Sequence, residues 1–485
     1  MAPAPSPATN NGSATAGALT SRRWLDPRSW FGAGPQNATD SIDSTGKRKE
    51  LTGRVRSKDV EIPDRKRRKL ISGTRDLQAN FEIAAWAIRK HLDFVAAFSL
   101  QFKTGDQDLN ADLERRFEEW ARPENCDAAG RHSLTSQIRL WEACRTIDGD
   151  VFPLKLRTGQ LQTIEGDRVQ TPTRDRPHLD AQENIVNGVE VNNVGKALRF
   201  AVHKRTSQGL EFDKWIGSRR LLQFGYFDRF DQFRGVSPIA AAINRFQDVY
   251  ESFDYALARA KVAQLFGLVL FRDAEDSLGN LDPKPGEAND SDDDNQPDPY
   301  ADLQLGTRPM ILDMEAGDDA KFLENKTPAV EFQQFTAAMI AVALKSLDIP
   351  FSFYQENFTN FFGSRAALML YLKSANHKRH TLQDLMRKIT VWRLGLWIRA
   401  GELDLPASLP LRDLRFEWVP AGTPWWNPSQ EVTANVKAID EKLTTRSAVY
   451  KETHGGDWFA EVPPVLALEE QAIREALGEF EEPTP

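Results

Sequence analysis

The sequence predicts an α+β protein in which a mixed body carries two long helices and a small β insertion. Three observations lead to this fold class. In the first half of the chain, segments with apolar residues at helical spacing are followed by segments of period two. Near the middle, two long helical segments flank a short β-like stretch. The last third of the chain returns to a mainly helical pattern.

Composition limits the classes of protein to consider. The 485 residues exceed a single ordinary domain, and 40% hydrophobic content supports a real core. The net charge of −8 argues against a protein that coats nucleic acid through bulk positive charge. Cys126 and Cys144 have no metal or redox spacing and are interpreted as idle thiols. Because there is no signal-peptide pattern and no apolar run near ~18 residues, we expect a soluble, intracellular protein with no membrane contact.

Residues 1–73 are expected to be largely disordered. They are rich in Ala, Pro, Ser, Thr, Gly and Asn, and they end in the basic runs "GKRKE" and "DRKRRKL". Such a segment buries too little apolar surface to offset the entropy lost on ordering. The basic run 65–69 is interpreted as a solvated linker, in preference to a nucleic-acid contact or a localisation signal.

The first part of the body is predicted over 74–236. "TRDLQANFEIAAWAIRKHLDFV" is helical by spacing, with Thr74 as its N-cap, and "LNADLERRFEEWAR" and "SLTSQIRLWEACRTI" are further amphipathic helices. "DGDVFPLKLRTGQLQTIEGDRV" and "NIVNGVEVNNVGKALRFAVHKR" have strand periodicity, and the Asn-Gly pair in the second stretch is a hairpin signal.

The middle of the chain predicts a pair of long helices. The first covers 237–262 and reaches about 39 Å at 1.5 Å per residue. Its apolar residues recur with a period of 3.5, which is typical of a helix packed on another helix. These residues are Ile239, Ile243, Phe246, Tyr250, Phe253 and Leu257. The second helix, over 329–347, has Phe332, Phe335, Met339 and Val342 at matching spacing. Between them lie the strand-like "GLVLFRD" and "RPMILDM" and an acidic loop, 286–302.

The rest of the chain is predicted as a loop, a third long helix and a helical end. Residues 351–362 mix aromatic and amide side chains, and the pattern fits a packed loop and a ligand-facing loop equally well. The helix 364–400, capped by Ser364 and ended by Gly401, has eight Lys or Arg against one acid, Asp384. "LRFEWVPAGTPWWNPS" is a strand and loop, and helices with an acidic tail follow.

No stretch of the sequence predicts catalysis, a metal or a cofactor. The common phosphate-loop, zinc-protease, nucleophile-elbow and dinucleotide motifs are absent. His377 and His380 stand among basic residues that would repel a cation. Asp290, Asp292 and Asp294 begin a calcium-loop pattern that lacks its glycine and its closing glutamate. We therefore assign no catalytic, cofactor-binding or metal-ligating residue.

The order of several short stretches resembles the lambda-type family of phage portal proteins, from about residue 74 to residue 461. The stretches are "TRDLQANFEIAAWAI", "FEEWARPENCDAAGRHSL", "DGDVFPLKL", "LQTIEGDRV", "QFRGVSPIAAAI", "LDIPFSFY", "NFTNFFGSRAALM" and "NPSQEVTANVKAIDEKLTTRSAVYKETHGGDW". Each is short, but the collinear series is specific. Asp150 departs from the glutamate that is frequent in the family, and Asn427–Pro428 departs from Asp–Pro.

The resemblance implies a ring, usually of twelve subunits, at one capsid vertex of the virion, built in the host cytoplasm. Such a ring docks the terminase large subunit for genome packaging, contacts the major capsid protein and a head-tail adaptor, and passes double-stranded DNA for ejection. The implied parts are a wing (74–236 and 363–425), stem helices (237–262 and 329–347), a clip (263–328), a tunnel loop (348–362) and a crown with acidic tail (426–485). Gln355, Asn357 and Asn360 would then face the DNA channel.

The physical chemistry agrees with a conduit. A channel for DNA should not hold it tightly, because each neutralised phosphate strengthens binding. An acidic chain with amide contacts in the loop 351–362 meets this requirement without sequence readout. Two alternatives remain open at this point. A nucleic-acid-acting enzyme would need an ordered carboxylate cluster, for which Asp292–Asp294 is the densest candidate, and a different phage head-tail adaptor would need a smaller fold.

Overall fold

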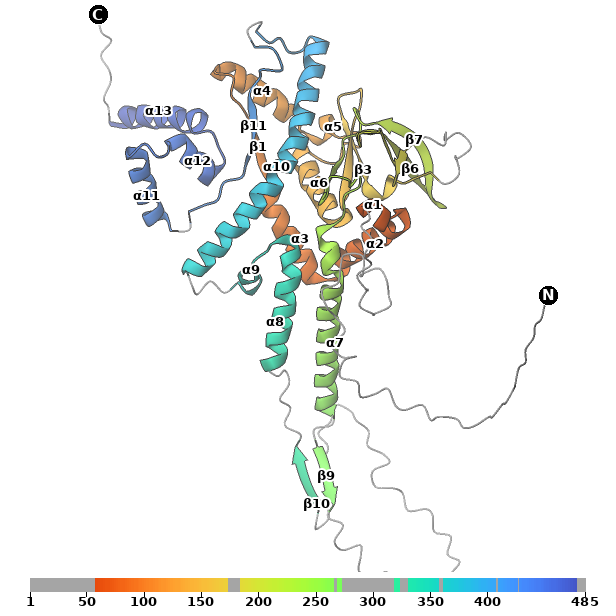
Figure 1. The fold of residues 1–485 in the computed structure, drawn as a ribbon. Coiled ribbons are helices and arrows are strands. Elements are labelled where there is room, and N and C mark those ends of the chain that lie inside the picture. The colour runs from red at the N-terminus through yellow and green to blue at the C-terminus, as the bar shows by residue number, and fades with distance from the viewer. Residues whose placement is uncertain are drawn as a thin grey trace, which may run out of the picture.

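The computed structural model describes residues 57–172, 184–265, 268–272, 318–322, 330–356, 361–406, 409–425 and 427–477. Two long helices project side by side from a broad mixed body, and a two-stranded ribbon lies beyond them (Figure 1). The two helices are α7 (Ile243–Leu265) and α8 (Val330–Leu344), and the ribbon pairs β9 (Leu268–Arg272) with β10 (Asp318–Phe322) in antiparallel register. The predicted α+β class is confirmed, and so are the two long helices. The first strand of the ribbon lies in the predicted "GLVLFRD", but the predicted strand "RPMILDM" lies outside the described residues, and β10 is a later segment.

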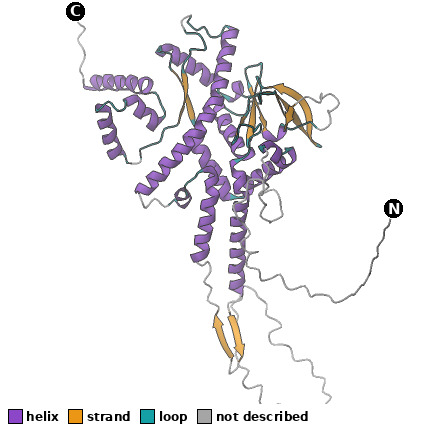
Figure 2. Ribbon diagram, in the orientation of Figure 1, coloured by secondary structure: helices purple, strands orange, loops and turns teal. Residues whose placement is uncertain are grey.

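Helices make up most of the body; small sheets lie at one side of it, and a further pair of strands lies among the helices (Figure 2). The main core lies between the helices, and its largest fully buried side chain is Trp141. Several of the helices begin at clear local signals, such as the side-chain caps of Asp106 and Ser133. The helices are α1 (Lys58–Glu61), α2 (Asp64–Asn80), α3 (Glu82–Val95), α4 (Gln107–Trp120), α5 (Pro123–Cys126), α6 (Leu134–Asp148), α9 (Phe351–Gln355) and α10 (Phe361–Ala400).

The sheets are antiparallel throughout. β2 (Asp150–Lys155) pairs with β3 (Leu161–Glu165) and with β8 (Phe224–Gly225). A second sheet has the order β4 (Asn184–Val186), β5 (Val189–Val191), β6 (Ala197–Thr206) and β7 (Gly209–Gly217). The predicted Asn-Gly hairpin is confirmed, since Asn187 and Gly188 both have positive φ between β4 and β5. β1 (Phe98–Phe102) pairs with β11 (Phe416–Pro420), which joins two distant parts of the chain.

The expectation of disorder up to residue 73 is wrong for residues 57–73, which form α1 and most of α2. Leu70 and Ile71 pack into the protein, and Arg67 of the basic run is 4% exposed. The Arg67 guanidinium donates to the carbonyl of Gly235 and pairs with Asp59, so its charge is satisfied by tertiary contacts. Burial and the neighbouring Arg234 lower the pKa of Arg67 to about 10. Composition alone could not reveal these partners.

Two predicted helix starts are also wrong. Thr74 does not cap a helix but lies inside α2, where its hydroxyl donates to the carbonyl of Leu70. The helix predicted from residue 74 onward is divided at Phe81, which has an extended conformation between α2 and α3. Likewise α10 begins at Phe361, so Ser364 is inside the helix, whereas Gly401 does end it with φ of 72°.

The C-terminal helices α11 (Pro428–Asp440), α12 (Arg446–His454) and α13 (Trp458–Leu477) form a separate group beside the body (Figure 1). The group is attached where the end of α12 meets the segment after β11. A Cβ on Gly455 would lie 2.8 Å from the nitrogen of Gly422, so neither backbone leaves room for a side chain. Glu417 of β11 also pairs with Lys451 of α12 and, at 2.6 Å, with Lys103. The predicted C-terminal helices are confirmed.

Candidate functional site

The root of the projecting helix pair is fixed by a buried ion pair between Arg234 and Asp150. Arg234 Nε donates to Asp150 Oδ2 at 2.6 Å and Nη2 donates to Oδ1 at 3.0 Å, and both residues are fully buried. The guanidinium also donates to the carbonyls of Gly166 at 2.7 Å and Asn187 at 2.8 Å. Burial lowers the pKa of Arg234, but Asp150 outweighs it and the net shift is upward.

Close backbone contact strengthens the same junction. A Cβ on Gly235 would lie 2.0 Å from the carbonyl oxygen of Gly149, and a Cβ on Gly149 would lie 2.8 Å from Gly235 O. Gly149 also has φ of 94°, a conformation that favours glycine. The stretches "DGDVFPLKL", "LQTIEGDRV" and "QFRGVSPIAAAI" therefore meet at one point in space. This point is where the chain leaves the body and enters the helix pair.

The predicted apolar seam of the first long helix divides into two halves. Ile239, in the 3₁₀ turn Pro238–Ala242, and Ile243 and Phe246 at the start of α7 are 2%, 6% and 4% exposed. The second half of the seam is exposed, with values of 44% for Tyr250, 43% for Phe253 and 54% for Leu257. Only the half nearest the body is buried within one chain.

The two helices contact each other through aromatic side chains. Phe253 of α7 lies edge-on to Phe332 of α8 at a ring separation of 6.4 Å, and Tyr250 lies against Phe81 at 4.9 Å. Of the residues at matching spacing on α8, Phe335 is 58% exposed and Val342 is 60% exposed within the single chain, so their packing on another helix stays a prediction. The buried face of α8 instead contains Thr336, Ile340, Ala343 and Leu344. A 3.6-residue period places these residues on one side of the helix.

The predicted tunnel loop is partly helical. Residues 351–355 form α9, whose aromatic side chains pack on the body: Phe353 lies 5.9 Å from Phe94 and 5.6 Å from Tyr371. Tyr354 lies 6.0 Å from Trp86. Gln355, at the end of α9, is exposed. Asn357 and Asn360 lie outside the described residues, so the grouping of the three amides stays a prediction.

A polar clamp holds the segment that leads into α9. Asp348 has φ of 62° and accepts hydrogen bonds from Ser374 at 2.6 Å and Lys378 at 3.0 Å. Burial raises the pKa of Asp348, but these two donors outweigh it and hold the pKa below its usual value. Lys378 also donates to the carbonyl of Leu347 at 3.0 Å. The sequence gives no local signal for this clamp, because its partners are about 30 residues apart.

Many of the basic side chains of α10 have partners within the chain, which the sequence alone does not show. Lys378 and Arg379 are buried, and Arg379 donates to the carbonyl of Phe94. Arg365 pairs with Glu431 of α11, and Arg393 stacks on tryptophan rings. The other four basic residues lie on the exposed side of α10: Lys373, Arg387, Lys388 and Arg399. About half of the basic side chains of α10 are therefore buried, paired or stacked within the chain.

The described part of the chain contains no arrangement that would support metal chemistry, since no three His, Cys, Asp or Glu residues there are placed around a common point. The Asp290–Asp294 cluster lies outside the described residues. Burial raises the pKa of the Cys126 thiol to about 11 and that of Cys144 to about 12, so both are protonated thiols at neutral pH. Within the described helices, none has the length and apolar character of a membrane span.

The chain thus has a broad body, a projecting pair of helices with a partly exposed apolar seam, and a separately attached group of C-terminal helices. The family model that describes phage portal proteins of the lambda family matches residues 45–375, and the chain belongs to this family. The resemblance inferred from the short motifs is thereby confirmed.

Individual relatives are distant. A probable portal protein of Halomonas phage phiHAP-1 is 24% identical over 355 residues, which are 69% of this chain and 65% of that protein. The chain thus spans just under two thirds of the length of this curated relative. Among solved structures, the virion of a native gene transfer agent particle has a TM-score of 0.44 at 14% identity, over 79% of this chain and 92% of the other. The neck of the empty particle has a TM-score of 0.45 at 13% identity, over 78% and 92%.

Proposed function

We propose that the chain is one subunit of a ring of twelve copies that forms the DNA conduit at one vertex of a phage capsid. Membership of the portal family supports this proposal, and the observation that carries it is the exposed half of the α7 seam. Tyr250, Phe253 and Leu257 continue a stripe that is buried nearer the body, yet each is more than 40% exposed. A second copy of α7 and α8 would cover these side chains, because a large exposed apolar patch usually marks an interface.

The C-terminal helices supply a second surface of the same kind. Their exposed large apolar side chains are concentrated on α13 and α11, and a packed neighbour would remove them from water. These side chains are Phe459, Val465, Leu466, Leu468, Ile473, Val432 and Val436. On α10 the exposed residues Lys373, Arg387 and Lys388 would meet acidic groups of a neighbouring copy, which fixes the register between subunits.

The proposal divides the chain by role. The body segments 74–236 and 363–425 would be the wing, and 237–262 with 329–347 the stem. The insertion 263–328 would be the clip that contacts the terminase and the head-tail adaptor, and 426–485 would be the crown, with its acidic tail. The wing would lie against the major capsid protein. In this arrangement the chain has no catalytic task, and DNA moves through the ring during packaging and ejection.

The ring is tested by imaging the purified full chain. Negative-stain microscopy is expected to show rings with a central hole, and mass photometry is expected to give a single species of about twelve subunits. Since covering the apolar seam drives assembly, the rings should persist when salt is raised and surface charge is screened. A preparation that remains monomeric at all salt and protein concentrations would contradict the proposal.

The tunnel loop is tested by changing Gln355, Asn357 and Asn360 together to alanine. If these amides contact passing DNA through short-range, sequence-independent hydrogen bonds, intact rings should package DNA but retain it less well. Packaged DNA per particle and its loss over time are the measurements. The matched control changes two exposed residues in turns of the β4–β7 sheet, Asn193 and Gln208, to alanine. Retention equal to that of the control would remove the loop from the proposal.

A further inference from the structure

The turn at residues 226–233 holds one phenylalanine completely outside the chain. Phe230 is 111% exposed, whereas most phenylalanine side chains are buried or partly buried. Asp228 and Asp231 flank it, and each is exposed and forms no ion pair with a described residue. Arg229 is the one cation between them, so residues 228–231 have a net charge of about −1. We call these four residues the Phe230 knob.

The turn is rigid because Gln232 closes it from the inside. Gln232 is 6% exposed, and its Nε2 donates to the carbonyls of Tyr226 at 3.2 Å and Arg234 at 2.7 Å. Its Oε1 accepts a hydrogen bond from the backbone nitrogen of Asp228 at 3.0 Å. The buried amide thus uses both of its ends inside the turn. A partner would therefore meet a preformed knob and lose little free energy in ordering it.

The knob lies on the side of the body that contains the sheets. The backbone nitrogen of Phe233 donates to Asp59 of α1 at 2.6 Å. A Cβ on Gly195, in the turn between β5 and β6, would lie 3.6 Å from the Phe233 ring. In Figure 1, α1 and the sheets lie to one side of the helix pair, and the N-terminal half of α10 extends to the other side.

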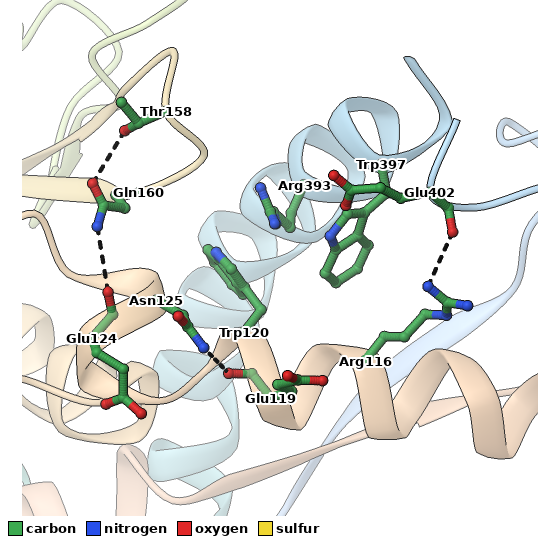
Figure 3. A pocket seen from close by; sticks show the side chains of 10 residues that line it. All are labelled: Arg116, Glu119, Trp120, Glu124, Asn125, Thr158, Gln160, Arg393, Trp397 and Glu402. Atoms are coloured by element: carbon green, nitrogen blue, oxygen red, sulfur yellow. Dashed lines mark hydrogen bonds between the residues drawn. The ribbon is translucent and has the colours of Figure 1, made fainter. Parts of the chain in front are cut away.

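The C-terminal end of α10 is engaged by its own chain. It lines a cavity of about 510 Å³ together with α4, α5 and the turn that joins β2 to β3. Figure 3 shows Arg393 of α10 beside Trp120 of α4 and Trp397 of α10. The guanidinium carbon lies 4.7 Å from the ring centre of Trp397 and 5.5 Å from that of Trp120. The polar surroundings and stacked rings leave no apolar surface here for a neighbouring molecule to cover.

The N-terminal half of α10 presents an apolar stripe instead. Met369 is 61% exposed and Leu370 is 72% exposed. The exposed Ala366 and Lys373 extend the stripe by one turn in each direction, since residues three and four apart share one face of a helix. Lys373 forms no ion pair with a described residue. We call these four residues the α10 stripe; a small alanine beside an adaptable methionine suits the packing of an aromatic ring.

The knob and the stripe lie at the same level, near the root of the helix pair. Ser374 of α10, one turn after Leu370, donates to Asp348 at 2.6 Å. Burial raises the pKa of Tyr226, at the start of the turn, to about 12, and the nearby Asp348 carboxylate acts in the same direction. A ring built by rotation about an axis along the helix pair brings together surfaces at the same height. The knob and the stripe meet this condition, on opposite sides of the chain.

We propose that the Phe230 knob of each copy packs on the α10 stripe of the next copy, with the flanking carboxylates paired to Lys373. This inference rests on the proposed ring and specifies one of its contacts. Because the two surfaces differ, the contact is head-to-tail, and such contacts join copies into a closed ring. The charges also match, since the knob is net negative and the stripe ends in a cation. The exposed apolar residues of α13 lie near Glu469 and Glu470, which would repel the knob.

Cross-linking between two variants of the full chain tests the contact. One variant has Asp231→Cys and the other has Lys373→Cys, so Phe230 and the apolar part of the stripe stay intact. Mixed before assembly and treated with a short bismaleimide, they should give a covalent dimer on a denaturing gel, whereas each variant alone should give only monomer. Burial raises the pKa of Cys126 to about 11 and that of Cys144 to about 12, so the native thiols should not compete.

The matched control for this experiment is Glu211→Cys in place of Asp231→Cys. Glu211 is an exposed acid on β7, in the sheets on the same side of the chain, and it should give much less dimer with Lys373→Cys. Rings that form but give no more 231–373 dimer than the control would overturn this contact and leave the ring intact. A chain that stays monomeric under all conditions would contradict the ring and this contact together.

Phe230→Ala measures the contribution of the knob. Because Phe230 is fully exposed, the thermal midpoint of the monomer should not change. The protein concentration at which half of the chains are in rings, measured by mass photometry, should rise about tenfold, as is usual when an aromatic anchor of an interface is removed. The control is Leu443→Ala, at an 81% exposed position between α11 and α12, which should assemble like the unmodified chain. Equal assembly of the two variants would overturn the proposal.

Discussion

Replacing Arg234 by methionine is expected to lower the free energy of unfolding by roughly 3–5 kcal/mol, because the fully buried carboxylate of Asp150 then loses its partner. The same change removes the guanidinium donor from the carbonyls of Gly166 and Asn187. Chemical denaturation followed by tryptophan fluorescence measures the loss. As a control, Arg219→Met, at an exposed position, should change stability by less than about 0.5 kcal/mol.

A double-mutant cycle separates the ion pair from packing. Asp150→Asn should lower stability much less in the Arg234→Met background than it does alone. In that background it removes a buried carboxylate that has already lost its partner, whereas alone it leaves the buried Arg234 unpaired. The junction also holds the start of the helix pair through the Gly149–Gly235 contact. If Arg234→Met were as stable as Arg219→Met, the ion pair would have no part in fixing the root of the helix pair.

Phe246→Ala is expected to destabilise the folded chain by about 3–5 kcal/mol, as is usual when a buried phenylalanine is truncated in a core. Phe246 is 4% exposed, in the half of the seam that packs against the body. Two turns further along α7, Phe253 is 43% exposed and belongs to the other half of the same seam. Phe253→Ala should cost the single chain only about 0.5–1.5 kcal/mol, through loss of the ring contact with Phe332.

The two variants should separate folding from assembly. Phe246→Ala is expected to lower the unfolding midpoint of the monomer, whereas Phe253→Ala should leave a folded monomer that assembles poorly. Thermal unfolding and mass photometry on the same samples give both quantities. Normal rings from Phe253→Ala would mean that the exposed half of the seam is not a subunit interface, even if Phe246→Ala behaves as expected.

Local patterns predicted the elements of the fold well. The 3.5-residue recurrence located α7, and the Asn187–Gly188 pair located a hairpin, because each signal depends on neighbours in the sequence. Burial was predicted less well. The periodicity that includes both Phe246 and Phe253 cannot tell which half of the helix meets the body, since that depends on where α2 and α8 lie.

Long-range polar contacts could not be predicted at all. Arg234 and Asp150 are 84 residues apart, and nothing near either residue marks the other as its partner. Arg67 was interpreted as solvated because basic runs usually are, yet it is buried and bonded to the carbonyl of Gly235 and to Asp59. Lys378 is likewise buried, with partners on another segment that its neighbours do not reveal. The cavity around Arg393 was missed for the same reason, since its indoles come from α4 and α10.

The pairing of β1 with β11 has a consequence for synthesis on the ribosome. β1 ends at Phe102, whereas its partner begins at Phe416, so the body cannot close until most of the chain has been translated. The helix pair is made earlier, while the body from which it projects still lacks α10 and β11. Nascent chains on one polysome therefore carry the helix pair before their bodies are complete. Domains generally fold as units once they are complete. In the proposed ring, copies would accordingly join after release, as whole molecules, because the body of each is completed only late in translation.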